Sequence, residues 1–237
     1  MATTARPGKA QGKAQWKELC MDTAGGEELG RFWAPALGLE FHPDDQAGYL
    51  TGPTEGHGIA MCVVPERKTV KHRVHIDVHT PSVVHLQALG ASVVRPSEES
   101  GLAWTVMSDP EGGELCAFVR KPEDLADYRF YELVVDAVDP ASVARWWGGV
   151  LGLEARGAED EWWLEGIAGM PFECLVFGAV PEPKTVKNRI HWDVYGEAGE
   201  LLAAGARLLR EPDDDISWHV LADPEGNEFC CFEPPAR

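Results

Sequence analysis

Apolar and polar residues alternate along several short segments of the chain. In 188–194, for example, Ile190 and Trp192 alternate with His191 and Asp193. A period of two places the two sets on opposite faces of a β-strand. The pattern predicts strands at 18–22, 75–78, 131–136 and 191–194, each with one face packed on helices and the other lining something polar.

The helical segments between these strands end at glycine. Leu37-Gly38, Leu89-Gly90 and Leu151-Gly152 each follow a helical run, and Gly205 marks a fourth stop. Glycine adopts the left-handed conformation that closes a helix without steric cost. Each half of the chain therefore shows the order strand, helix, strand twice.

Three long blocks occur twice, in the same order and at nearly constant offset. They are GRFWAPALGLE at 30–40 and ARWWGGVLGLE at 144–154, PERKTVKHRVHID at 65–77 and PEPKTVKNRIHWD at 181–193, and DPEGGELC at 109–116 and DPEGNEFC at 223–230. Such a repeat indicates a tandem duplication. We expect a flexible tail at 1–15, one domain at 16–120, a polar linker at 121–129 and a second domain at 130–237. The Asp-Pro-Glu-Gly segments fit type I turns that precede a final strand in each copy.

Composition and charge restrict the function classes. Hydrophobic residues make up 44% and charged residues 25%, which is typical of a globular chain with enough apolar material for two cores. A formal net charge of -18 argues against nucleic-acid and anionic-membrane partners. The N-terminal stretch lacks the apolar segment of a secretory signal, and no apolar run approaches the ~20 residues that span a bilayer. Six cysteines are few for a disulfide scaffold, so we expect a cytoplasmic protein with free thiols.

The repeated blocks KNRIHWD at 187–193 and DPEGNEFC at 223–230 resemble the actinobacterial glyoxalase-like branch of the vicinal-oxygen-chelate superfamily. The resemblance covers nearly the whole chain after residue 15. It implies an α+β fold of tandem glyoxalase/bleomycin-resistance domains, each made of two βαβββ modules whose sheets curl around a cavity. In metal-using members, one position on the first strand and one on the last strand of each module bind the ion.

Those family positions fall on defined residues of this chain. The first copy presents Glu18, Cys62, His75 and Cys116, and the second presents Glu132, Gly178, His191 and Cys230. Zinc accepts carboxylate, imidazole and thiolate ligands, but Gly178 offers no side chain. The cysteines also suit simple packing, and Glu18 and Glu132 suit pairing with Arg73 and Arg189. We therefore expect no obligatory metal cofactor and keep a divalent metal ion as the alternative.

The histidines lie in a row of polar residues. Arg73, His75 and Asp77 share one strand face, as do Arg189, His191 and Asp193. Such a row suits a hydrogen-bonded ladder that stabilises the sheet, and it also suits a histidine held as a general base. No nucleophile elbow, phosphate loop or dinucleotide glycine motif is present. The repeated Lys-Thr-Val-Lys segments are expected to form solvated loops between modules.

Tryptophans concentrate in the second copy. Trp162 and Trp163 are adjacent on a predicted strand and must point to opposite faces, so one of them faces the cavity. With Trp192 and Trp218 in the same copy, this predicts an aromatic pocket there. The predicted ligand-binding residues are Trp162, Trp163, Glu132, His191, Glu18 and His75.

These observations predict a small-molecule-binding, glyoxalase-like protein of the bleomycin-resistance type that sequesters an aromatic metabolite or antibiotic. The alternative is a metal-dependent lyase or isomerase acting on a 2-oxo compound through an enediolate, or a dioxygenase. A third hypothesis is that one copy is functional and the other structural, since they differ at Cys62/Gly178 and Gly48/Trp162. Whether the chain is an enzyme, and whether it is a monomer or a homodimer, stays open.

Overall fold

The computed structural model describes residues 12–45 and 47–235. Residues 1–11 of the expected tail lie outside the described residues, whereas Ala14 and Gln15 already belong to the first strand. No helix in the described part of the chain is long and apolar enough to cross a membrane.

Four consecutive βαβββ modules make up the chain. Module 1 contains β1 (Ala14–Thr23), α1 (Glu28–Leu37), β2 (Glu40–His42), β3 (Tyr49–Thr51) and β4 (Ile59–Val63). Module 2 contains β5 (Val74–Thr80), α2 (Val83–Leu89), β6 (Ser92–Arg95), α3 (Ser97–Ser100), β7 (Thr105–Ser108) and β8 (Glu114–Val119). Module 3 contains β9 (Phe130–Ala137), α4 (Pro140–Leu151), β10 (Arg156–Ala158), β11 (Glu161–Glu165) and β12 (Cys174–Ala179). Module 4 contains β13 (Ile190–Gly196), α5 (Ala198–Ala203), β14 (Arg207–Arg210), β15 (His219–Ala222) and β16 (Glu228–Phe232).

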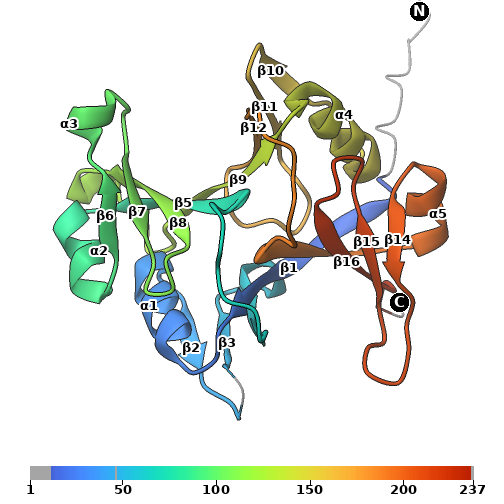
Figure 1. Ribbon diagram of the computed structural model, residues 1–237, viewed down its shortest axis with the longest axis horizontal. Coiled ribbons are helices and arrows are strands. Elements are labelled where there is room, and N and C mark those ends of the chain that lie inside the picture. Colours follow the sequence, from blue (N-terminus) through green and yellow to red (C-terminus); the bar gives the residue numbers. More distant parts are fainter. Residues whose placement is uncertain (1–11, 46, 236–237) are drawn as a thin grey trace, which may run out of the picture.

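Each of the two sheets joins one module from each copy. Sheet A has the order β14-β15-β16-β13-β1-β4-β3-β2, and sheet B has the order β10-β11-β12-β9-β5-β8-β7-β6. The joins are antiparallel, between β1 and β13 and between β5 and β9. In Figure 1 the blue β1 accordingly lies beside the orange and red strands of the last module.

The tandem α+β fold is therefore confirmed, but its module pairing differs from the expected cavity within each copy. The physical reason is that the alternation of apolar and polar residues specifies which face of a strand is buried. It does not specify which other strand pairs with its edge. Because β1 pairs with β13, and β5 with β9, neither copy completes a sheet without the other.

The apolar faces of both sheets pack against helices in a core that contains the bulkiest side chains. Trp33, Trp147 and Trp192 are completely or almost completely buried. The rings of Trp147 and Trp192 lie 5.0 Å apart. The expected grouping of Trp192 and Trp218 with Trp162 and Trp163 is not formed, because the first two lie on or beside strands of sheet A and the last two on β11 of sheet B.

Two predicted local signals take the expected form. Gly38 and Gly152 end α1 and α4 at φ values of 75° and 71°, in the left-handed region that favours glycine. In the repeated turn, the N–H of Gly112 donates to the carbonyl of Asp109 at 3.0 Å. The turn glutamates also reach the other sheet: Glu225 accepts from the backbone N–H groups of Val138 and Asp139 at 2.9 and 2.5 Å.

Candidate functional site

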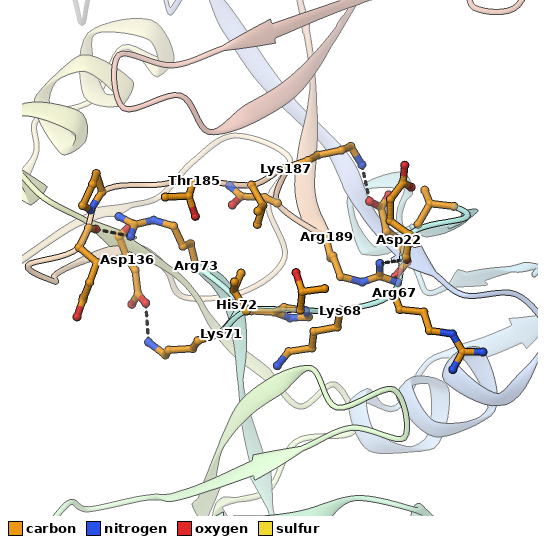
Figure 2. A pocket seen from close by; sticks show the side chains of 18 of the residues that line it. Asp22, Arg67, Lys68, Lys71, His72, Arg73, Asp136, Thr185, Lys187 and Arg189 are labelled. Carbon is orange, nitrogen blue, oxygen red and sulfur yellow. Dashed lines mark hydrogen bonds and ion pairs between the residues drawn. The ribbon is translucent and has the colours of Figure 1, made fainter.

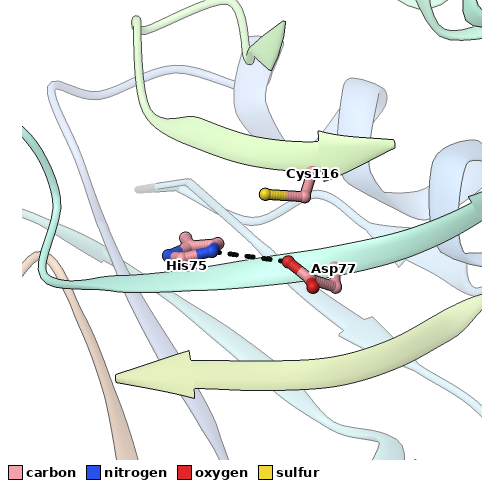
Figure 3. Close-up of side chains that lie close together, drawn as sticks. All are labelled: His75, Asp77 and Cys116. Atoms are coloured by element: carbon pink, nitrogen blue, oxygen red, sulfur yellow. Dashed lines mark ion pairs between the residues drawn. The ribbon is translucent and has the colours of Figure 1, made fainter. Parts of the chain in front are cut away.

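Each sheet carries on its second face a compact, buried cluster of one histidine, one aspartate and one cysteine. On sheet B, His75 and Asp77 of β5 meet Cys116 of β8 (Figure 3). On sheet A, the equivalent residues are His191, Asp193 and Cys230. Within each cluster the potential ligand atoms lie within 4.8 Å of one another. We call these surfaces polar face B and polar face A.

The same strand register builds both clusters. Histidine and aspartate are two residues apart on one strand and so point to the same side. The neighbouring parallel strand places Cys116 in register with Asp77, and Cys230 in register with Asp193. The His75 Nε2 to Asp77 Oδ1 distance is 3.4 Å, and the corresponding distance from His191 to Asp193 is 3.8 Å.

Burial governs the protonation of these groups. It lowers the pKa of His75 to about 4 and that of His191 to about 3, so both imidazoles are neutral at pH 7. Burial raises the pKa of the Cys116 and Cys230 thiols, which therefore stay protonated. A cysteine nucleophile needs a thiolate, so neither cluster is arranged for cysteine nucleophilic catalysis.

The donor atoms of both clusters fit a divalent metal ion. Oδ1 of Asp77 and Oδ1 of Asp193 are buried without a hydrogen-bond partner, and the imidazole atom that lies nearest each of them is Nε2 of His75 or His191. Buried polar atoms are normally paired, so this pattern needs a reason. Neutral imidazole, carboxylate and cysteine sulfur are all zinc ligands once binding removes the thiol proton.

Cross-copy pairing regroups the two ligand sets predicted from the sequence. Glu18 and Cys62 lie on sheet A with His191 and Cys230, whereas Glu132 and Gly178 lie on sheet B with His75 and Cys116. Glu132 is in register with Asp77, and Glu18 with Asp193. Each predicted set of four therefore divides between two faces, because the modules of one copy belong to different sheets.

The carboxylates on the facing strands have different partners. Glu18 forms an ion pair with Lys17. Burial raises the pKa of Glu132 to about 7, and the nearby Glu161 and Glu173 carboxylates contribute to this rise. A hydrogen bond from Tyr131 lowers the pKa and only partly offsets these effects. The alternative interpretation, in which Glu18 and Glu132 pair with arginines, is not what the structure shows: Arg73 donates to the carbonyls of Glu182 and Asp136, and Arg189 to those of Glu66 and Asp22.

Sheet A carries two further thiols that have no counterpart on sheet B. Cys20 of β1 is in register with His191 of β13. The sulfur of Cys20 lies 2.9 Å from the sulfur of Cys62 on β4. The tandem repeat and the strand register place Val134 and Gly178 at the corresponding positions of face B.

Aromatic side chains flank both clusters at equivalent positions. Beside face B, the rings of Trp104 and Phe118 are stacked at 5.2 Å, and Phe118 contacts Tyr131 edge-on at 5.3 Å. Beside face A, Trp218 and Phe232 are stacked at 4.9 Å. These aromatic residues are half-buried, so each cluster has an apolar wall beside it.

The register of sheet B assigns the two adjacent tryptophans to different sides. Trp163 pairs with Val176, Val176 with Val134, and Val134 with His75, so Trp163 shares face B with the histidine. Trp162 points to the helix side, where the guanidinium of Arg145 on α4 lies 4.3 Å from its ring centre.

A cavity of about 850 Å³ lies between the loops 64–73 and 180–189, and its lining does not include the residues of either cluster. Figure 2 shows the Lys71–Asp136 and Lys187–Asp22 ion pairs at two sides of it. Its charged walls are mostly satisfied by such contacts between the two copies. The other lysines of the repeated segments, which are expected on solvated loops, form ion pairs within their own copies: Lys68 with Glu114 and Lys184 with Glu228.

Asp77, Asp193 and Cys20 are not among the ligand residues predicted from the sequence. The aspartates lie two residues after each histidine, which is a readable signal for a shared face. Cys20 lies two residues after Glu18 and carries the same signal. Trp104 and Phe118 become recognisable as a pair only through the register of β7 and β8.

Comparison with known proteins identifies related domains. Residues 18–118 and 132–232 each match the family model described as a glyoxalase-like domain. None of the curated proteins compared matches the chain. Glyoxalase I from Zea mays has a TM-score of 0.63 at 12% identity, with 93% of this chain and 92% of that chain covered. A putative dioxygenase from Bacillus subtilis has a TM-score of 0.63 at 15% identity, covering 96% of this chain and 87% of that one. At such low identity these structures show the fold alone.

Proposed function

The chain belongs to the glyoxalase-like domain family, and on this premise we propose that polar face B binds a small, planar, positively charged molecule. The observation that supports this most is the presence of half-buried aromatic rings and clustered carboxylates on one face. The proposal keeps the binding function predicted from the sequence and adds the charge of the ligand.

The aromatic wall supplies a surface for stacking. Trp104, Phe118 and Tyr131 form a continuous set of ring contacts, and Tyr131 also stacks with His79 at 4.3 Å. A planar ligand on such a wall gains ~0.5–1.5 kcal/mol beyond the burial of its area. The Arg120 guanidinium already lies 5.5 Å from the Phe118 ring centre and 5.7 Å from that of Tyr131, so the wall accepts a cation.

The carboxylates favour a positive charge. Glu161 and Glu173 both raise the pKa of Glu132, after burial, to about 7. A bound cation would stabilise the ionised form of Glu132, so binding would become stronger as the pH rises through 7. An anion of the same shape would meet repulsion at this face.

Titration of the full chain with proflavine, a planar cationic dye, tests the proposal through tryptophan fluorescence. We expect saturable binding at pH 8, weaker binding at pH 6, and none for the planar anion 9-anthracenecarboxylate. Trp163→Ala should weaken proflavine binding about 3–10-fold, because it removes an indole from the same face.

Trp162→Ala is the matched control because it removes the same ring from the same strand on the opposite side. It should leave the affinity unchanged and lower the free energy of unfolding by about 2 kcal/mol, since Trp162 packs against the core. Equal affinity of the parent and Trp163→Ala, or tighter binding of the anion, would contradict the proposal.

A second candidate is metal-dependent catalysis, the alternative class from the sequence. The Oδ1 atom of Asp77, which is buried without a hydrogen-bond partner beside Nε2 of His75, favours it. Together with Cys116 they would hold the ion on face B, where a divalent ion supplies Lewis-acid polarisation of a substrate oxygen. Glu132, with a pKa of about 7, would accept and return a proton beside it. Elemental analysis of protein purified without chelator tests this: no bound metal in the parent, or unchanged metal in a His75→Ala, His191→Ala double variant, would exclude it.

A further inference from the structure

We propose that hydrogen peroxide joins Cys20 and Cys62 in a reversible disulfide on polar face A, and that polar face B does not form the corresponding bond. The two residues lie on the neighbouring parallel strands β1 and β4. Cys20 is in register with Ala60 and Cys62 with Asp22, so the cysteines are diagonal neighbours on one side of the sheet.

The two sulfur atoms need little movement to bond. They lie 2.9 Å apart, and a disulfide bond is about 2.05 Å long, so closure requires an approach of less than about 1 Å. In the part of the chain that the structure describes, which includes all six cysteines, no other two cysteine sulfurs are in such contact. The short contact is therefore a specific property of this pair.

The two cysteines differ in access to solvent. Cys20 is buried and Cys62 is half-buried. Peroxide therefore reaches Cys62 first: its thiolate attacks one oxygen, the O–O bond breaks, and sulfenic acid and hydroxide form. The sulfur of Cys20, after loss of its proton, then attacks the Cys62 sulfur and expels the second oxygen as hydroxide. In total, two thiols and one hydrogen peroxide give one disulfide and two waters.

Oxidation would change face A directly. Cys62 belongs to the ligand set predicted from the sequence, and Cys20 is in register with His191. A disulfide would remove both sulfurs as metal or ligand donors and fix β1 to β4. Face B has Val134 and Gly178 at these positions and cannot form the corresponding disulfide.

Peptide mapping of the reduced full chain after peroxide treatment tests the proposal. Trypsin cuts after Lys17, Arg31 and Arg67, so Cys20 and Cys62 fall on the separate peptides 18–31 and 32–67, each with one cysteine. We expect these peptides to be joined, free thiols to fall from the six of the sequence by two, and dithiothreitol to restore both.

Controls separate this pair from general oxidation. Cys62→Ser should abolish the joined peptide. Cys174→Ser removes a half-buried cysteine from β12 of sheet B and should leave it unchanged. The mapping needs only the parent protein, so a poorly folded variant does not prevent a result. Folded parent protein that keeps all thiols, or that oxidises Cys62 without bonding to Cys20, would overturn the proposal.

Discussion

Polar faces A and B share one half of their chemistry and differ in the other half. The His-Asp-Cys cluster and the stacked Trp-Phe pair occur on both, and they come from modules 2 and 4. The facing strands come from modules 1 and 3 and differ. Face A receives Lys17, Cys20 and Cys62, whereas face B receives Tyr131, Val134 and Gly178.

This difference shows how a duplicated chain can diversify. Because each sheet takes one module from each copy, the shared half of a face and its variable half lie in different copies. Changes in module 1 or module 3 alter one face without disturbing the cluster on the other side of the join. Ligand selectivity would then reside in β1, β4, β9 and β12.

The strongest test transfers the thiol pair of face A to face B. In a Val134→Cys, Gly178→Cys double variant, peroxide should form a second disulfide, an all-or-none change. A Cβ atom at Gly178 would meet nothing within 4 Å, so the new side chain fits. Free-thiol titration should show a loss of four thiols from eight, the six of the sequence plus two.

The single variants Val134→Cys and Gly178→Cys serve as controls and should each lose only the two native thiols. If Cys20 and Cys62 join while the transferred pair stays reduced, side-chain identity alone does not explain the difference between the faces. The backbone of β9 and β12 would then have to differ from that of β1 and β4.

A second prediction concerns the residues behind the clusters. In module 4, the Asn188 amide donates to the Asn227 side-chain oxygen at 2.9 Å. Module 2 has His72 and Gly113 there, and a Cβ on Gly113 would lie 2.7 Å from Oδ2 of Asp109 and 2.8 Å from the His72 ring. Gly113→Asn alone should therefore lower the free energy of unfolding by about 2 kcal/mol through overpacking, as measured by urea denaturation.

Adding His72→Asn should recover part of that loss, because it removes the contact with the imidazole and recreates the amide pair of module 4, while the contact with Asp109 remains. The double-mutant cycle isolates this coupling. If Gly113→Asn lowers the free energy of unfolding by the same amount with and without His72→Asn, the cycle is additive. The asparagine pair of module 4 would then not form in module 2, and the prediction would be wrong.

The sequence was sufficient to predict the first strand and the helix of each module, but not which modules pair to form each sheet. Alternation located all four first strands, since β5 and β13 include 75–78 and 191–194, and the Leu-Gly stops located helix ends such as Gly38. The pairing of β1 with β13 could not be predicted from the sequence, because the backbone hydrogen bonds between two strands do not require particular residue types. Trp192 shows the consequence: its position in the second copy suggested a ligand wall, but it lies in the core.

The candidate site could also be predicted only in part: the residues within one module were found, but their partners from the paired module were not. His75 and Cys116 were selected through the family resemblance, and they lie together because both belong to module 2. Their partners across the join, such as Glu132, depend on which module is adjacent. Glu18 forms an ion pair with its neighbour Lys17, at a place where the register of β1 shifts. Such irregularities leave no periodic signal.

The smallest predicted effect concerns Glu132, whose pKa in the folded protein is raised from 4.5 to about 7. A raised carboxyl pKa lowers the free energy of unfolding, and this penalty has its full size above pH 7, where the carboxyl is ionised in both the folded and the unfolded state. The penalty decreases as the pH falls from 7 to 4.5 and is absent below 4.5, where both states are protonated. Glu132→Gln should therefore increase the free energy of unfolding at pH 8 by about 1 kcal/mol, allowing for the partial exposure of the carboxyl, and leave it unchanged near pH 4.5.

The equivalent change on face A, Glu18→Gln, sharpens the comparison. Glu18 is paired with Lys17, so its neutralisation removes a favourable contact and should give no gain at pH 8. Urea unfolding of both variants at pH 8 and pH 4.5 would measure the contrast. Equal stabilisation by the two substitutions would mean that the carboxylates sit in equivalent electrostatic environments, against the difference in their partners. A gain confined to Glu132→Gln would instead locate the unbalanced negative charge on face B, where the proposed cationic ligand would neutralise it.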